Sequence, residues 1–161
     1  MHPVERSLFI NAPPATVFRA YTDLSRWLEW NPHLRKVKFN GQGTLALGSK
    51  VSTGVKASPV STTWKVTDLE ADRSLTWKSS FPPGVGVVFD HLAEKEWGGT
   101  RATLRLTITG PLALVAWAGW VPLFVTGLPG PMDIMNQNEP GLFYGHNLQR
   151  SLYQLKSLIE A

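Results

Sequence analysis

One histidine lies on the apolar face of a predicted strand. From residue 87 to residue 93 the odd positions are Val87, Phe89, His91 and Ala93. Because successive side chains of a strand point to opposite faces, we expect His91 to have apolar neighbours. An imidazole titrates near physiological pH, so His91 could accept and donate a proton in a reaction. A core histidine hydrogen-bonded to the backbone is the alternative, and the sequence leaves both interpretations open.

Two further groups of side chains could move protons. Tyr144, near the start of the last predicted helix, carries a phenol that could act on a bound substrate. The even positions beside His91 include the carboxylates Asp90, Glu94 and Glu96. We expect these three to form an acidic row that faces solvent, and an acid–base pair is the alternative.

Other catalytic chemistries have no support in the sequence. The chain has no cysteine, which excludes disulfides, thiolate metal sites and a cysteine nucleophile. The four histidines form neither an HExxH nor an HxH pattern, so no metal site is expected. GxSxG and GxGxxG are also missing, so the sequence predicts neither a serine hydrolase nor a dinucleotide-binding enzyme, and we expect no cofactor.

The charge of the chain is modest. Sixteen Lys and Arg against twelve Asp and Glu give a net charge of +4. The densest basic group, Arg35, Lys36 and Lys38, is too small to form the cationic stripe that binds a phosphate backbone, so no nucleic-acid partner is expected. The first residues lack the apolar core of a signal peptide, which favours a cytoplasmic location. The oligomeric state stays open.

The order of the predicted elements is typical of an α+β fold. Residues 4–10 alternate as a first strand, and two short helices follow, the second capped by Asp23. Five or six strands fit between the glycine- and proline-rich breaks up to residue 109. A long helix follows from residue 141, with an apolar stripe of Leu148, Leu152, Leu155 and Ile159. We expect a curved antiparallel sheet wrapped around this long C-terminal helix, in a single domain over residues 1–161.

Alternation also indicates which side chains face the helix. Trp64 and Trp77 fall on the covered faces of their strands. Residues 100–109 alternate most clearly, with Leu104 and Leu106 directed inward and Thr103 directed outward. A sheet bent around one helix has more concave surface than a single apolar stripe can fill, so we expect an internal cavity.

The segment from residue 110 to residue 140 is unusually apolar. Leu106 to Met132 contains no charged side chain, yet prolines and glycines interrupt this run, which argues against a membrane span. We expect an apolar insertion or lid at about 110–140, with a short helix from about Leu112 to Val121. Trp117 and Trp120 would share one face of that helix, over the cavity or at a membrane surface.

Several short sequence patterns occur in an order that is typical of one superfamily. They lie at residues 10–18, 23–32, 48, 75–77, 90–91, 98–101 and 109–112, and they include Trp27-Leu28-Glu29-Trp30-Asn31-Pro32 and Gly98-Gly99-Thr100-Arg101. In these residues the chain resembles the START-like, helix-grip (SRPBCC) superfamily, especially its polyketide cyclase/dehydrase-like branch. The resemblance implies a helix-grip fold with a cavity. It does not select one activity, because lipid carriers, hormone receptors and cyclases share this fold.

We therefore expect the protein to bind a hydrophobic small molecule, a lipid or an aromatic polyketide-like compound, between the sheet and the final helix. One alternative is a cyclase- or dehydratase-type enzyme that uses His91 or Tyr144. Another is a membrane-peripheral lipid carrier that docks through residues 112–128. Trp27 and Trp30 are expected to close one end of the fold rather than to contact the ligand. The residues expected to line the ligand site are Trp64, Trp77, Phe89, His91, Leu104, Trp117, Trp120, Tyr144 and Leu148.

Overall fold

A computed structural model of the chain describes residues 3–56, 61–81, 84–111 and 142–161. The strands are β1 (Val4–Ile10), β2 (Leu34–Phe39), β3 (Lys50–Val55), β4 (Ser61–Glu70), β5 (Ser74–Phe81), β6 (Val85–Glu96) and β7 (Gly99–Thr109). The helices are α1 (Pro14–Thr22), the 3-10 helix η1 (Leu24–Arg26), α2 (Trp27–Trp30) and α6 (Leu142–Glu160). The predicted first strand, the two short helices after it and the final helix are confirmed.

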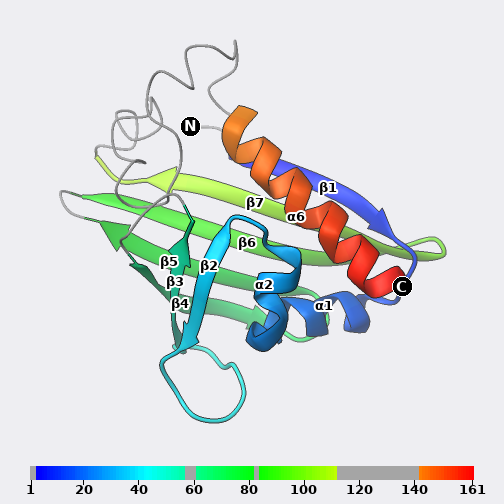
Figure 1. Ribbon diagram of the computed structural model, residues 1–161, viewed down its shortest axis with the longest axis horizontal. Coiled ribbons are helices and arrows are strands. Elements are labelled where there is room, and N and C mark those ends of the chain that lie inside the picture. Colours follow the sequence, from blue (N-terminus) through cyan, green and yellow to red (C-terminus); the bar gives the residue numbers. More distant parts are fainter. Residues whose placement is uncertain (1–2, 57–60, 82–83, 112–141) are drawn as a thin grey trace.

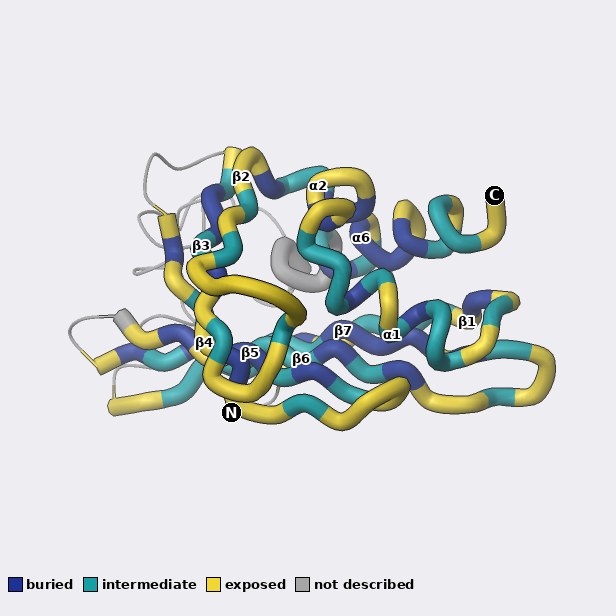
Figure 2. The backbone as a smooth tube through the Cα atoms, turned by 90° about the horizontal axis from the view of Figure 1, so that it is seen from below, coloured by how far each residue is buried: buried dark blue, intermediate teal, exposed yellow. Residues whose placement is uncertain are grey.

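The strands form one antiparallel sheet, in the order β1-β7-β6-β5-β4-β3-β2. The helices α1, α2 and α6 lie on one face of this sheet, and β2 and β3 rise at one end towards the helices (Figures 1 and 2). The predicted curved antiparallel sheet with a helix across its concave face is therefore confirmed, and the fold is α+β of the helix-grip type.

Helix α6 packs across β1 and β7 and against α2. Leu152 and Leu155 are fully buried, Leu148 is nearly so, and Tyr153 on the opposite face is exposed. This confirms the apolar stripe expected from the spacing of the leucines. None of the helices that the structure describes is long and apolar enough to cross a membrane.

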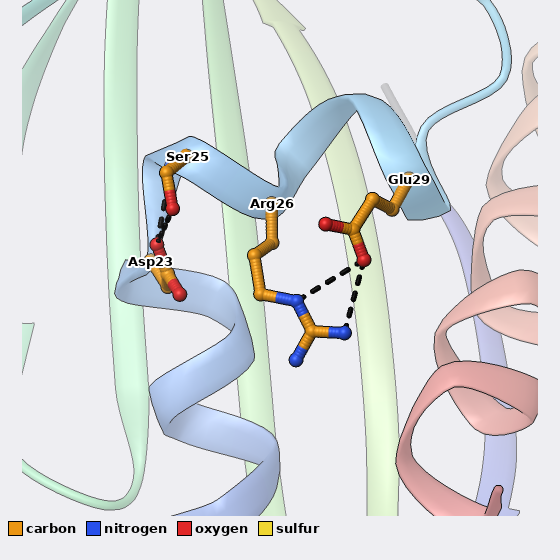
Figure 3. A network of polar contacts seen from close by, with 4 residues as sticks. All are labelled: Asp23, Ser25, Arg26 and Glu29. Carbon is orange, nitrogen blue, oxygen red and sulfur yellow. Dashed lines mark hydrogen bonds and ion pairs between the residues drawn. The ribbon is translucent and has the colours of Figure 1, made fainter.

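The two short helices are joined by a polar cap. Pro14 starts α1 in the first turn, where its missing N–H removes no helical bond. The carboxylate of Asp23 accepts hydrogen bonds from the backbone N–H and the hydroxyl of Ser25, at 3.2 and 2.5 Å, and so caps η1 (Figure 3). Arg26 pairs with Glu29 at 2.9 Å on the solvent side of α2. The predicted capping role of Asp23 is confirmed.

A glycine pair sets the turn between β6 and β7. Gly98 has a φ of 80°, a left-handed conformation that suits glycine. Any Cβ at Gly99 would collide with the backbone oxygen of Ile10. Gly98 therefore suits the turn, and the missing side chain of Gly99 allows β1 to approach β7 closely.

Strand alternation predicts the direction of most side chains but not the burial of Thr103. We expected this residue to face solvent, yet it is only 3% exposed. Its hydroxyl shares a hydrogen bond of 2.8 Å with Ser7 on the neighbouring strand β1. A cross-strand pair of short hydroxyl side chains can be buried because each satisfies the other.

Candidate functional site

A cavity of about 110 Å³ lies between the concave face of the sheet, α2 and the first described turns of α6. Strands β3 to β7 supply most of its walls, and the turn after α2 closes one side. Its lining residues are Trp27, Asn31, His33, Leu34, Thr53, Val55, Thr62, Trp64, Trp77, Phe89, His91, Leu106, Asn147 and Leu148. An engineered apolar cavity of about 150 Å³ holds benzene, so the described cavity matches roughly one aromatic ring.

Adjacent strands place the aromatic side chains of the sheet on the same face. The register pairs Trp77 of β5 with Phe89 of β6, and His91 follows Phe89 by two residues. The rings of Phe89 and His91 have centroids 4.4 Å apart, and those of Trp64 and Phe89 are 6.4 Å apart. The indole N–H of Trp64 donates to the hydroxyl of Thr53 at 2.9 Å, which fixes the ring in the cavity wall.

Helix α2 adds a second aromatic wall. Trp27 is 5% exposed, and its indole N–H donates to the carbonyl of Tyr21 at 2.9 Å. Its ring contacts the ring of Trp77 edge-on, at 5.4 Å between centroids. Trp27 therefore lines the cavity, although we expected it only to close the fold. Trp30 is fully buried and does not belong to the lining.

Both histidines of the cavity are held in the neutral form. Burial lowers the pKa of His91 to about 3, and a hydrogen bond to the backbone of Leu75 opposes this only in part. Burial also lowers the pKa of His33 to about 4, and the charges of Lys56 and Arg150 act in the same direction. At neutral pH each imidazole therefore offers one hydrogen-bond donor and one acceptor and carries no charge.

Three polar atoms of the cavity lining are buried and have no hydrogen-bond partner among the described residues. They are His33 Nδ1, Trp77 Nε1 and His91 Nδ1. Native structures leave few buried polar atoms unpaired, because each one costs about 1–3 kcal/mol. Within the described lining there is also no Asp, Glu, Lys or Arg. The site is therefore apolar and uncharged, with several unused hydrogen-bonding atoms.

The predicted site residues fall into three groups. Trp64, Trp77, Phe89, His91 and Leu148 surround the cavity together. Leu104 does not line it, because α6 packs on β7 and Leu104 is fully buried in the core. Trp117 and Trp120 lie outside the described residues, as does the side chain of Tyr144.

The acidic row has no part in the cavity. Asp90 accepts a hydrogen bond of 2.8 Å from the hydroxyl of Thr76, and Glu96 pairs with Arg101 at 2.6 Å. Glu94 is exposed. These carboxylates lie on the strand face opposite His91, as the alternation predicted. Within the parts of the chain that the structure describes, no group of His, Asp and Glu could hold a metal ion.

Several lining residues were not predicted from the sequence. His33 and Asn31 lie in the turn between α2 and β2, where neither helical nor strand periodicity assigns a direction to a side chain. Thr53 and Thr62 face the cavity from β3 and β4. The alternation around Trp64 already placed Thr62 on the covered face, but a threonine there gives no signal of ligand contact.

Comparisons with solved structures identify similar folds. The chain is similar to the Zhui aromatase/cyclase from Streptomyces sp. R1128, with a TM-score of 0.67 and 19% identity over 99% of this chain and 93% of that one. It is similar to the di-domain aromatase/cyclase StfQ from the steffimycin biosynthetic pathway, with a TM-score of 0.68 and 15% identity over 98% of this chain and 50% of that one. Protein MLL2253 from Mesorhizobium loti gives a TM-score of 0.67 and 15% identity, over 99% and 97% of the two chains. At these identities the likeness shows the fold alone.

The family is shown by the sequence itself. Comparison with curated proteins gave no match. The model of the family described as "Polyketide cyclase / dehydrase and lipid transport" matches residues 1–138, which is most of the 161-residue chain. With its sheet, helices and cavity, the chain therefore belongs to the polyketide cyclase / dehydrase and lipid transport family.

Proposed function

We propose that the protein binds a hydrophobic small molecule with an aromatic ring in the cavity between the sheet and α6. The observation that carries this proposal is the cavity itself, which Trp27, Trp64, Trp77 and Phe89 surround with aromatic rings. Such rings provide large flat apolar surfaces for stacking on a planar ligand. Membership of a family described by polyketide cyclisation and lipid transport supports a ligand of this class.

The size of the cavity limits the affinity that one ring can provide. Burial contributes about 0.8 kcal/mol for each apolar carbon, so a six-carbon ring gives about 5 kcal/mol, equivalent to a Kd of roughly 0.2 mM. A second ring raises this limit to about 8 kcal/mol, a Kd near 1 μM, only if it is buried as fully as the first. We therefore expect ligands of two or more rings, with one ring seated in the described cavity.

Calorimetric titration with naphthalene, anthracene derivatives and fatty acids tests this proposal. We expect saturable binding of the two-ring aromatic compounds. Trp64→Ala should weaken that binding about tenfold, because the indole forms part of the wall. Trp97→Ala is the matched control, since Trp97 in the β6–β7 turn is 99% exposed. A panel with no saturable binding at about 1 mM would overturn the proposal.

A cyclase- or dehydratase-type enzyme is the second candidate. Membership of the family supports it, as do the unpaired polar atoms of the cavity, which could orient the oxygens of a polyketone chain. A pKa near 3 makes His91 a weak general base at neutral pH, which favours an orienting role over proton transfer. Conversion of a synthetic polyketone thioester to an aromatic product by wild type, His91→Ala and Tyr144→Phe tests this candidate. Unchanged turnover in both variants removes the catalytic assignments.

Membrane docking through residues 112–128 remains a separate prediction, because that segment lies outside the described residues. Co-sedimentation with liposomes tests it. If the segment docks, the double substitution Trp117→Ala/Trp120→Ala should reduce the bound fraction, and equal bound fractions would contradict docking.

A further inference from the structure

We propose that the cavity selects an uncharged aromatic ligand bearing a hydroxyl group, which is held between the Trp77 indole N–H and the Nδ1 atom of His91. This inference rests on the proposed function and specifies the class of its ligand. It is carried by the position of the two side chains, by their hydrogen-bonding types and by the absence of charge in the described lining.

Trp77 and His91 are diagonal neighbours on the same face of the sheet. In the register of β5 and β6, Leu75 lies opposite His91 and Trp77 lies opposite Phe89. Diagonal positions on adjacent strands are within reach of long side chains. Both residues are 1% exposed, and the ring of Trp27 contacts both, at 5.4 Å from Trp77 and 5.8 Å from His91. Both side chains therefore line the cavity beside the same ring of Trp27.

The two unpaired atoms have complementary hydrogen-bonding types. The indole N–H of Trp77 is a donor only. The imidazole of His91 donates to the backbone of Leu75, and since Nδ1 is the nitrogen without a partner, the donor is Nε2. The neutral ring then leaves Nδ1 as an acceptor. A hydroxyl oxygen accepts from Trp77 while its hydrogen is donated to His91, so one group satisfies both atoms.

Other polar groups of a ligand would satisfy only part of this pair. A ketone or an ether accepts from Trp77 but leaves His91 Nδ1 unpaired. A carboxylate does the same and also carries a charge. Within the described lining no cation compensates that charge, because both histidines are neutral and the exposed Lys56 and Arg150 lie outside the lining. Burying an unpaired carboxylate is strongly unfavourable, whereas a phenol stays neutral up to about pH 10.

Calorimetry at pH 7 with four matched probes tests this inference: 2-naphthol, naphthalene, 2-methoxynaphthalene and 2-naphthoate. We expect 2-naphthol to bind about tenfold more tightly than naphthalene, because it pairs two buried atoms. The methyl ether keeps the acceptor but has no O–H, so it should bind less tightly than 2-naphthol. The carboxylate should bind most weakly of the three oxygen-containing probes.

Two tryptophan variants separate the polar pair from general packing. Trp77→Phe keeps an aromatic ring and removes the N–H, so the preference for 2-naphthol over naphthalene should fall about threefold or more. Trp97→Phe is the matched control, because Trp97 is 99% exposed and does not line the cavity. In this control variant the preference for 2-naphthol over naphthalene should equal that of the wild type.

The outcomes distinguish this inference from the proposed function. Equal affinities for 2-naphthol and naphthalene would overturn the hydroxyl pair while leaving the aromatic-binding function in place. Tightest binding of 2-naphthoate would overturn the selection of an uncharged ligand. If no probe gives saturable binding, both proposals fall. If Trp77→Phe does not fold, the comparison of 2-naphthol with its methyl ether on the wild-type protein still decides the role of the O–H.

Discussion

The imidazole of His91 is stacked on the indole of Trp27, with ring centroids 5.8 Å apart and planes inclined by 25°. This contact joins the middle of β6 to α2 and completes an aromatic enclosure that also includes Tyr21, Trp30 and Phe89. Such surroundings exclude water, which explains why the pKa of His91 falls so far below its ordinary value. The same enclosure orients the imidazole beside the cavity.

The two histidines of the cavity give the stability of the protein a pH dependence. His91 and His33 titrate at about 3 and about 4 in the folded chain, and near 6.5 when unfolded. Between pH 6.5 and pH 5 the unfolded state therefore binds more protons than the native state. The contribution of the neutral imidazoles to the free energy of unfolding is fully present above pH 6.5. It is lost as the pH falls, at up to about 1.4 kcal/mol per pH unit for each histidine. Urea unfolding at several pH values measures this slope.

His91→Gln tests which residue causes the dependence. Glutamine does not titrate, so the slope between pH 6.5 and pH 5 should fall to about half that of the wild type. The slope is informative even if the variant is less stable at every pH. A slope equal to that of the wild type would show that the His91 imidazole is not protected from protonation.

Truncation of two neighbouring residues of α6 should have very different effects on stability. Leu152 is fully buried in the core, and Leu152→Ala should lower the free energy of unfolding by about 2–5 kcal/mol. Tyr153 is 56% exposed, and Tyr153→Ala should change the free energy of unfolding by less than about 0.5 kcal/mol. Urea denaturation of both variants measures the difference. Similar losses in the two would contradict the packing of α6 on the sheet.

The cap at Asp23 should matter more than the nearby ion pair. Asp23→Ala removes the acceptor of two hydrogen bonds from Ser25 and should cost about 1 kcal/mol of stability. Glu29→Gln weakens the exposed pair with Arg26, and we expect a change below about 0.5 kcal/mol. Thermal unfolding of both variants checks the order, and a larger loss for Glu29→Gln would reverse it.

Filling the cavity should prevent binding without loss of the fold. Val55 is half-buried and lines the cavity from the end of β3, so an indole in Val55→Trp would occupy the space of a ligand ring. We expect binding of 2-naphthol to weaken by about tenfold or more. Lys65→Trp on the exposed face of β4 adds the same side chain away from the cavity and should bind normally. Equal affinities of the two variants would place the ligand elsewhere.

Much of the fold follows from periodicity. The alternation around His91 correctly placed it on the buried face, and the spacing of Leu148, Leu152 and Leu155 correctly predicted the face of α6 that packs on the sheet. These assignments succeed because strand and helix geometry fix side-chain direction at every second residue, or every third to fourth residue. The burial of Thr103 was not predicted because it depends on a partner hydroxyl on β1, which alternation within one strand does not show.

The site was less predictable than the fold. Trp64, Trp77 and Phe89 could be placed on the covered face, but periodicity does not distinguish a cavity wall from packed core. For that reason Leu104, which lies in the packed core, was included among the expected ligand-site residues. His33 reaches the cavity from the turn that follows α2. Trp27 reaches it because α2 packs on β5 and β6. Those contacts depend on tertiary structure, which local sequence patterns do not specify.

The most direct test of ligand binding is an NMR titration that follows the indole N–H resonances of the tryptophans with 2-naphthol. The cavity predicts saturable shifts for Trp27, Trp64 and Trp77, the largest at Trp77, with no shift for the fully exposed Trp97. Shifts that are confined to Trp97, or no saturable shift at the three cavity tryptophans, would contradict a ligand site between the sheet and α6.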